Sequence, residues 1–355
     1  MKKYKILHIT DMHLRHNGRL FYSTGKKINN GLILNGHNVL QMSDRDITNQ
    51  TKNIFDIGGK KYLFNRIVKT IENFKPDLIL FGHVDRLNDD NFLSLKEKYN
   101  SIKFSQWFID PLNINGPDFI KNKKRFFMKY QFCDNNFITT SPEDLDFVDS
   151  TKTHFIPNPI DPSIETLKNF QNKTTHDIFI AISHGQHRGI LRKHYIDDRV
   201  KIIKNLNNKA TYNIFGYQKN PVWGQDFFDE ISKCSMGINL SRGLPIKYYS
   251  SDRISSLLGN GLLTFIHENY KYNDFLNKNE IVSYKNINDL NKKIIYFKKN
   301  KKKLEIIARN GYNKAHRIFN NKLISDFIVK KSIFLLRSLT FLYVIISSLL
   351  KKSLY

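Results

Sequence analysis

Cysteine is scarce in this 355-residue chain: Cys133 and Cys234 are the two present, and they lie far apart. Two such cysteines build neither a disulfide framework nor a cysteine-based zinc site, and they favour a reducing compartment. Long hydrophobic runs are also few, and 40% hydrophobic with 25% charged residues is ordinary for a folded protein. This composition excludes a disordered chain, a collagen-like fibre and a multi-span membrane protein. The opening MKKYKILHIT has only a short apolar stretch, so we expect no secretory signal and a cytoplasmic location.

Acidic residues are few relative to basic ones. The chain has 57 Lys and Arg against 32 Asp and Glu, a formal net charge of +25, and residues 285–355 hold 17 basic but only 3 acidic residues. A basic segment of this kind favours an anionic partner, which can be a nucleic acid, an anionic lipid or a phosphate-bearing substrate.

Apolar runs typical of buried strands alternate with helical patterns in the first half of the chain. Strands separated by helices predict a parallel sheet in a doubly wound α/β domain. The expected strands are Tyr4–Thr10, a short strand around Val39 and Leu40, Asp77–Gly82, Ile102–Asp110 and Asn135–Ser141, and the expected helices begin at Thr24 (ending near Gly36) and span Leu63–Phe74.

Three prolines within His154–Ser163 mark a linker, because neither a helix nor a central strand accommodates them. After the linker the alternation restarts, so we expect domains at 1–157 and 158–320, with a helix and tail at 321–355. Two α/β domains on a hinge form a cleft, and such sheets bind ligands at the carboxyl ends of their strands. The expected second series is strand Asp177–Ser183, helix Asp198–Leu206, strand Thr211–Gly216, helix Asp226–Cys234, strand Met236–Ser241, helix Ser251–Gly261 and strand Leu262–His267.

Five segments follow one another in the order of a known family. They are Gly18–Leu40 with its Gly-His-x-Val turn, Pro76–His83, Gln106–Pro111, Ile156–Asp161, and the helix-containing Ser250–Ile266. Together they resemble the GT-B glycosyltransferases, in particular the CgeB-like, glycosyl transferases group 1 proteins. The resemblance runs from about Lys5 to Asn320. It implies two Rossmann-like domains facing across a cleft, the first for the acceptor and the second for a nucleotide-sugar donor.

The resemblance also implies the site residues. His83 and Asp110 stand at strand carboxyl ends and are the candidate catalytic residues, since glycosyl transfer uses a carboxylate or histidine near the acceptor hydroxyl. The alternative for each is a structural role, as a residue at a strand end whose side chain forms hydrogen bonds with the backbone. The candidate donor-binding residues are Gly18, Gly185, Arg188, Arg192, Asn239, Arg253 and Ser256.

Two features of the donor set need comment. Arg188 and Arg192 lie in a basic loop after a strand, and arginine binds phosphate oxygens as a fork; the alternative is a solvated basic loop. Ser256 stands where the family's helix usually has a glutamate that holds the ribose, and a hydroxyl makes a weaker contact. Ser250 or Ser251 is expected to cap this helix. No metal and no cofactor beyond the nucleotide-sugar are expected, because cations and the helix terminus stabilise the leaving diphosphate.

Two other functions have partial support in the sequence. The opening Asp11-x-His13 resembles calcineurin-like metallophosphoesterases, which bind two metal ions, but no Gly-Asn-His segment follows. A nucleic-acid-binding role would use the +25 charge, yet no recognised nucleic-acid module is present, so nucleic acid is not an expected partner.

The end of the chain, Ser332–Tyr355, is its most hydrophobic stretch. Residues 338–350 are uncharged and as a helix span roughly 20 Å, less than the ~30 Å hydrocarbon core of a bilayer. An interfacial anchor on anionic lipid is the favoured interpretation, and packing on the protein's own first domain is the alternative.

From the resemblance and the tail together, we expect a hexosyl- or related sugar transferase that acts on a glycan or lipid-linked acceptor in polysaccharide biosynthesis. We expect it to be peripheral on the inner face of the cell membrane.

Overall fold

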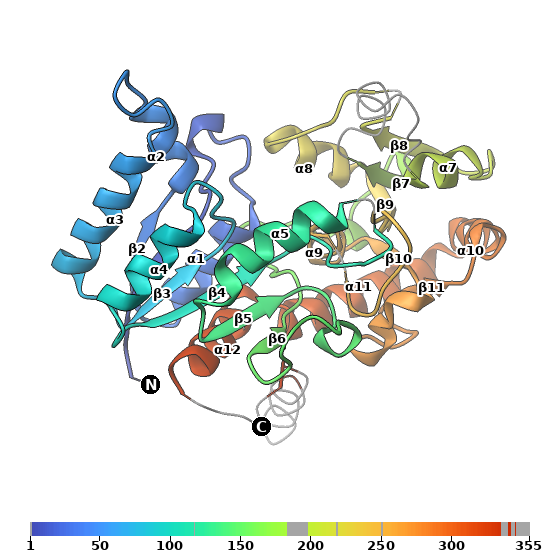
Figure 1. Cartoon of the computed structure of the whole chain (residues 1–355). Helices are drawn as coiled ribbons and strands as arrows, with labels where there is room; N and C mark the ends of the chain where they lie inside the picture. The colour runs from blue at the N-terminus through green and yellow to red at the C-terminus, as the bar shows by residue number, and fades with distance from the viewer. Residues whose placement is uncertain are drawn as a thin grey trace. The chain divides into compact units, whose positions relative to one another are not determined.

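The computed structural model describes residues 2–116, 118–182, 198–217, 219–249, 251–334, 340, 341 and 345. The chain forms two compact units (Figure 1). The first unit comprises Met1–Leu112, Asp118–Pro159 and Asn321–Tyr355, and the second comprises Asn113–Pro117 and Ile160–Asn320.

The first unit is built on a six-stranded parallel sheet in the order β2-β1-β3-β4-β5-β6. The strands are runs of buried apolar residues, as parallel strands covered on both faces require. Strand order reverses between β1 and β3, so the carboxyl ends of these two strands form the switch point of the sheet. The strands are β1 (Lys5–Ile9), β2 (Asn38–Met42), β3 (Leu78–Phe81), β4 (Lys103–Phe108), β5 (Asn135–Ile138) and β6 (Thr153–Phe155).

Helices cover both faces of the first sheet. On one face the core joins α2, α3 and α4 to β1 and β3, while α5 packs through Phe126 and Tyr130. On the other face α1 lies against α12: an added Cβ at Gly31 would overlap the backbone of Asn321, and the Ser325 hydroxyl donates to the Ile28 carbonyl over 3.0 Å. The helices are α1 (Thr24–Leu34), α2 (Asp44–Gln50), α3 (Lys60–Phe74), α4 (Asp89–Lys98), α5 (Phe119–Tyr130) and α12 (Asn321–Ile333), with 3-10 turns η1 (Leu14–His16) and η2 (Pro142–Asp144).

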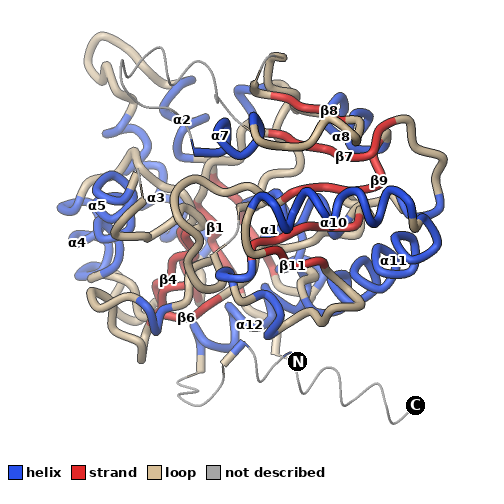
Figure 2. The backbone as a smooth tube through the Cα atoms, turned by 90° about the vertical axis from the view of Figure 1, so that its right-hand side faces the viewer, coloured by secondary structure: helices blue, strands red, loops and turns tan. Residues whose placement is uncertain are grey.

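The second unit is built on a five-stranded parallel sheet in the order β11-β10-β9-β7-β8. Figure 2 shows β8, β7 and β9 running side by side. The chain passes from β7 to β8 and then crosses to β9 on the other side of β7, so the switch point lies between β7 and β9. The strands are β7 (His176–Ala181), β8 (Tyr212–Phe215), β9 (Cys234–Ile238), β10 (Leu263–His267) and β11 (Val282–Tyr284).

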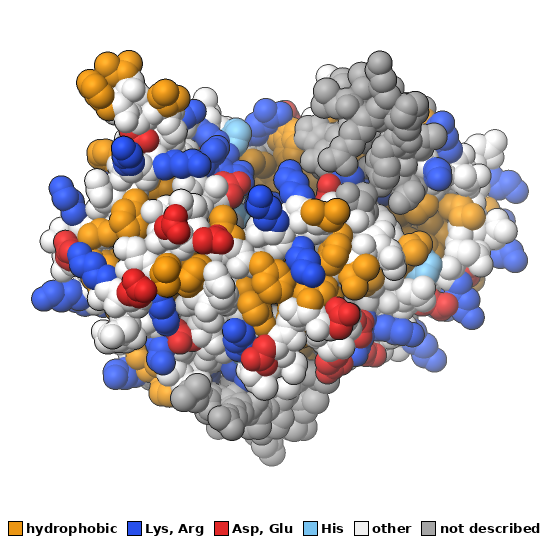
Figure 3. Space-filling view, in the orientation of Figure 1, with side chains coloured by type: hydrophobic (Ala, Val, Ile, Leu, Met, Phe, Trp, Pro, Cys, Tyr) orange, Lys and Arg blue, Asp and Glu red, His pale blue; other side chains and the backbone are white. Residues whose placement is uncertain are grey.

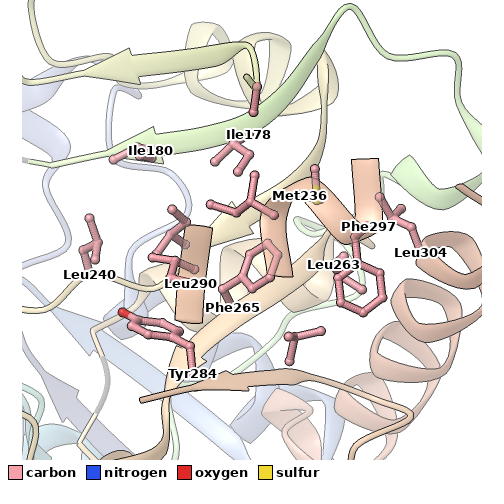
Figure 4. Close-up of a cluster of buried hydrophobic side chains, with 14 of the residues drawn as sticks. Ile178, Ile180, Met236, Leu240, Leu263, Phe265, Tyr284, Leu290, Phe297 and Leu304 are labelled. Carbon is pink, nitrogen blue, oxygen red and sulfur yellow. The ribbon is translucent and has the colours of Figure 1, made fainter. Parts of the chain in front are cut away.

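The core of the second unit lies between its sheet and helices α7, α10 and α11. Side chains from β7, β9 and β10, among them Ile178, Met236 and Phe265, meet Leu290 and Leu304 from the helices (Figure 4). On the opposite face Phe227 of α8 lies edge-on to Phe179. The helices are α7 (Asp198–Lys204), α8 (Gln225–Ser232), α9 (Arg253–Gly259), α10 (Ile287–Lys299) and α11 (Lys301–Ile318), with 3-10 turns η3 (Asn169–Gln171), η4 (Glu268–Tyr270) and η5 (Tyr272–Asp274).

The tail has a few described residues, among which Thr340 is exposed and Phe341 is buried. The Phe341 ring packs edge-on against Phe327 of α12, with 5.3 Å between ring centroids, and it also contacts Phe155 of β6. Ile345 is likewise buried. These contacts support the alternative in which the tail packs on the first domain. Within the described part of the chain, no helix has the length and apolar character that crossing a membrane requires.

Candidate functional site

In the first unit, two neighbouring strands bring the candidate catalytic residues together. His83 follows β3 and Asp110 follows β4, and their nearest atoms, Nε2 and Oδ2, lie 4.0 Å apart. The backbone N–H of His83 donates to the hydroxyl of Thr10, which follows β1, over 3.2 Å. His83 is therefore fixed at the switch point of the first sheet.

Arg125 of α5 holds both side chains at once. Its Nη1 donates to Asp110 Oδ2 over 2.7 Å and its Nη2 donates to His83 Nδ1 over 3.2 Å. Since a guanidinium has donors only, Nδ1 of His83 must accept, and the proton of the neutral ring is on Nε2. Arg125 lies in a lysine-rich segment whose pattern predicts no helix, so the sequence alone does not identify it.

The imidazole of His83 is neutral at physiological pH. It stacks on Trp107 and Phe108, at 5.6 and 5.2 Å between ring centroids. Burial lowers the pKa of His83 to about 4, and the adjacent charge of Asp110 opposes this only in part. Nε2 has no hydrogen-bond partner in the described structure, and the Asp110 side chain is one-third exposed. A buried N–H donor thus lies beside a partly exposed carboxylate acceptor, a pairing that can bind one hydroxyl group.

Asp11 and His13, the basis of the phosphoesterase alternative, are differently arranged. Both oxygens of Asp11 accept from Arg15, over 2.6 and 2.8 Å, and Arg45 adds a contact of 3.2 Å. Among the described residues, no group of three His, Cys, Asp or Glu is placed to hold a metal ion. The Asp11 carboxylate therefore forms ion pairs with two arginines, Arg15 and Arg45. Gly18 lies in the same β1–α1 loop with φ +82°, and no atom of the described residues lies within 4 Å of a Cβ added there.

In the second unit, Arg253 spans the switch point. From the first residue of α9, its Nε donates to the carbonyl of Ala181 at the end of β7 over 2.8 Å. Its Nη1 donates to the carbonyl of Leu240, just past β9, over 2.5 Å, and to the Ser251 hydroxyl over 2.8 Å. Among the described residues Nε and Nη1 have acceptors, whereas Nη2 has none.

Burial and a second arginine shape the charge at this position. Burial, followed by the nearby charge of Arg199, lowers the pKa of Arg253 to about 10. Arg253 remains protonated at neutral pH at the carboxyl edge of the second sheet, and the positive charge of Arg199 acts on it. Such an edge attracts an anion, and a phosphate oxygen is an acceptor that fits the guanidinium fork.

Asn239 adds an unsatisfied amide at the same edge. It directly follows β9, is 1% exposed, and its backbone N–H donates to the Phe265 carbonyl over 3.0 Å. Neither Nδ2 nor Oδ1 of its side chain has a hydrogen-bond partner in the described structure. A buried amide without a partner costs about 1–3 kcal/mol, so its retention points to a ligand that supplies one.

The remaining candidates are less informative. The Ser256 hydroxyl is buried and donates back to the Asp252 carbonyl over 3.4 Å, inside its own helix. The expected cap of that helix is wrong for Ser251: the N-cap residue is Asp252, without a side-chain cap, and Ser251 accepts from Arg253 instead. Gly185, Arg188, Arg192 and Ser250 lie outside the described residues.

The comparisons with known proteins agree with this geometry. Residues 192–328, which include Asn239, Arg253 and Ser256, match the model of a family described as glycosyl transferase-like. This part of the chain is similar to that family. A search of curated proteins finds no sequence match.

Solved structures extend the likeness from residues 192–328 to both units. Anabaena HepE bound to UDP superposes with a TM-score of 0.57 at 11% identity, over 92% of this chain and 99% of HepE. Sucrose-phosphate synthase from Thermosynechococcus elongatus gives 0.61 at 9% identity, over 92% and 98%. A glycosyltransferase from Rickettsia africae gives 0.58 at 15% identity, over 96% and 100%. The GT-B fold predicted from the sequence is confirmed.

Proposed function

We propose that the protein transfers a sugar from a nucleotide-sugar donor to a hydroxyl group of an acceptor. The observation that carries this proposal is Arg253, whose guanidinium spans the carboxyl ends of β7 and β9 and keeps Nη2 for a ligand. The unpartnered amide of Asn239 lies on the same strand edge. Anabaena HepE, which shares the fold, was solved with UDP and with UDP-glucose, and this supports a donor of the same class.

On the donor side, the diphosphate is the leaving group and develops negative charge as the glycosidic bond to it breaks. Arg253 donates to a phosphate oxygen through Nη2, and Arg199 adds positive charge nearby. Arg188, Arg192, Gly185 and Ser256 belong to the same proposed donor site. These cations take the role that a metal ion has in other transferases, so we propose metal-independent transfer with no cofactor beyond the donor.

On the acceptor side, Asp110 and His83 bind the attacking hydroxyl. The hydroxyl donates its proton to the Asp110 carboxylate and accepts a hydrogen bond from Nε2–H of His83. As the hydroxyl oxygen attacks the anomeric carbon, its proton passes to the carboxylate. With its pKa lowered to about 4, His83 stays neutral and orients the oxygen rather than taking the proton.

The charge of the chain supports a proposal for the acceptor and the location. A net charge of +25, with 17 basic residues among 285–355, favours association with an anionic surface. We propose a glycan or lipid-linked acceptor, a role in polysaccharide biosynthesis, and peripheral attachment at the cytoplasmic face of the membrane through the basic C-terminal segment.

A thermal-shift panel of nucleotide sugars tests the donor site. A specific donor raises the unfolding temperature by mass action, and the strongest shift identifies the nucleotide. Arg253→Lys retains a positive charge but loses the forked guanidinium, so it should reduce the donor-induced rise in unfolding temperature. Arg66→Lys, on the exposed face of α3, is the matched control and should leave that rise unchanged. A shift that is equal in both variants would remove Arg253 from the site, and no shift with any nucleotide sugar would contradict the proposed function.

A further inference from the structure

The loop between α2 and α3 projects three large apolar side chains into solvent. Ile54 is 82% exposed, Phe55 is 87% exposed and Ile57 is 81% exposed. In Figure 3 hydrophobic side chains, in orange, gather at the tip of this loop at the upper left. Leaving three such side chains in water is unfavourable, and clustered exposure of this kind marks an interaction surface.

The loop is held in this projecting form by its own polar residues. Asn53 Oδ1 accepts from the backbone N–H groups of Phe55 and Asp56, each over 2.9 Å. The Asp56 carboxylate accepts from the backbone N–H groups of Lys60 and Tyr62, each over 3.0 Å, and thereby ties the loop to the first turn of α3. These bonds fix the turn while its apolar side chains point away from the core.

The charges around the tip have one sign. Lys52 precedes it, Lys60 and Lys61 follow it, and all three lysines are exposed. Asp56 is the one acidic residue between Asp46 and Glu72, and its carboxylate is already engaged by α3. An apolar tip with a rim of lysines is complementary to an anionic lipid surface, where acyl chains lie beneath a layer of phosphate.

We propose that the apolar tip, defined as Ile54, Phe55 and Ile57 with Lys52, Lys60 and Lys61, inserts into the interfacial region of an anionic bilayer. The three apolar side chains enter the boundary between headgroups and acyl chains, and the lysine ammonium groups pair with lipid phosphates while their stems cover the apolar rim. This contact is separate from the C-terminal segment and does not depend on the proposed chemistry.

The full-length protein is tested with vesicles of phosphatidylcholine alone or mixed with phosphatidylglycerol. The triple variant Ile54→Ser, Phe55→Ser, Ile57→Ser should bind the mixed vesicles at least about tenfold more weakly than wild type does. Leu93→Ser, which removes an exposed apolar side chain from α4 in the first unit, is the control and should bind as wild type does. Donor-induced thermal shifts should be the same in all three proteins.

A second readout reports on the tip itself, even when other segments also bind the membrane. The Phe55→Trp variant should gain blue-shifted emission on mixed vesicles, after subtraction of the signal of Trp107 and Trp223 in wild type. High salt should weaken the response without abolishing it, because only the lysine contribution is screened. Unchanged partition of the triple variant together with unshifted emission would overturn the proposal. So would a triple variant that changes oligomeric state but not vesicle binding, since the tip would then contact a second copy.

Discussion

Arg125 donates to Nδ1 of His83 over 3.2 Å, and this contact decides which nitrogen of the imidazole carries the proton. The same guanidinium binds Asp110, so one residue of α5 sets both the tautomer of the histidine and the position of the carboxylate. The proposed acceptor site therefore depends on a residue that itself contacts no reacting atom.

Replacing Arg125 with Gln should raise the pKa of His83 above its value of about 4. The charge of Arg125 lowers that pKa, and its loss also leaves the Asp110 charge unpaired beside the ring. NMR titration of the imidazole measures the change, and turnover should fall by about 10²-fold as the pair loses its orientation. Lys124→Gln, on the exposed face of the same helix, is the control. A His83 that titrates identically in both variants would contradict the role given to Arg125.

Stability should fall on mild acidification because several histidines of the first unit are buried in the neutral form. Burial lowers the pKa of His8 and of His83 to about 4, and that of His154 to about 3, from the usual 6.5. Between pH 6.5 and these values the unfolded chain binds more protons than the folded one. The free energy of unfolding then falls by up to about 1.4 kcal/mol per pH unit for each histidine.

Urea titrations at stepped pH, followed by Trp107 emission, measure this dependence. The transition midpoint should be nearly constant between about pH 7 and 8, below the pH at which Lys129 loses its proton, and should decrease steadily as the pH falls toward 4. His8 lies in the core, where it accepts from Trp107 Nε1 over 3.1 Å, so it contributes to stability and not to the site. A midpoint that stays flat through the acid range would show that these imidazoles are not buried as neutral groups.

Two buried asparagines of the second unit offer a matched pair. The side chain of Asn239 has no partner in the described structure, whereas Asn213 Nδ2 donates to Glu230 Oε2 over 2.8 Å. Asn213→Leu should therefore lower the free energy of unfolding by about 1–3 kcal/mol, and Asn239→Leu should leave it unchanged or raise it. Donor-induced stabilisation should show the reverse pattern, with loss only in Asn239→Leu. Calorimetric unfolding with and without UDP measures both, and a normal UDP response of Asn239→Leu would count against a binding role.

The tail prediction concerns Phe341, which is buried against Phe327 and Phe155. Phe341→Ala should lower the free energy of unfolding by about 3 kcal/mol, because the variant loses apolar burial and leaves a cavity. Phe334→Ala, at a half-exposed position near the end of α12, should cost much less. If both variants unfold like wild type while vesicle binding is lost in Phe341→Ala, the tail is a membrane anchor and not a part of the first unit.

The sequence predicted the strands well because parallel strands buried on both faces are apolar runs with clear ends. Asp77–Gly82 contains β3 (Leu78–Phe81), and Ile102–Asp110 contains β4 (Lys103–Phe108). The position of His83 and Asp110 beyond these strands followed from that pattern.

Other features were not accessible from the pattern. The helix that carries Arg125 has the sequence FIKNKKRFFMKY, in which lysines interrupt the apolar residues, and it becomes regular only when Phe126 and Tyr130 pack on the sheet. The bonds of Arg253 to the carbonyls of Ala181 and Leu240 join segments that are distant in sequence, so only the fold reveals them. The absence of a side-chain partner for Asn239 is likewise a property of the folded state.

The most direct test of sugar transfer is acceptor-dependent release of nucleoside diphosphate from the nucleotide sugar that stabilises the protein most, measured in EDTA with a water-soluble glycan acceptor. Wild type should release diphosphate and glycosylate the acceptor at undiminished rate in EDTA, and Asp110→Asn should bind the donor normally but lose turnover. Metal-dependent hydrolysis of phosphoesters that requires Asp11 and His13, with no glycosylated product from any donor, would contradict the account.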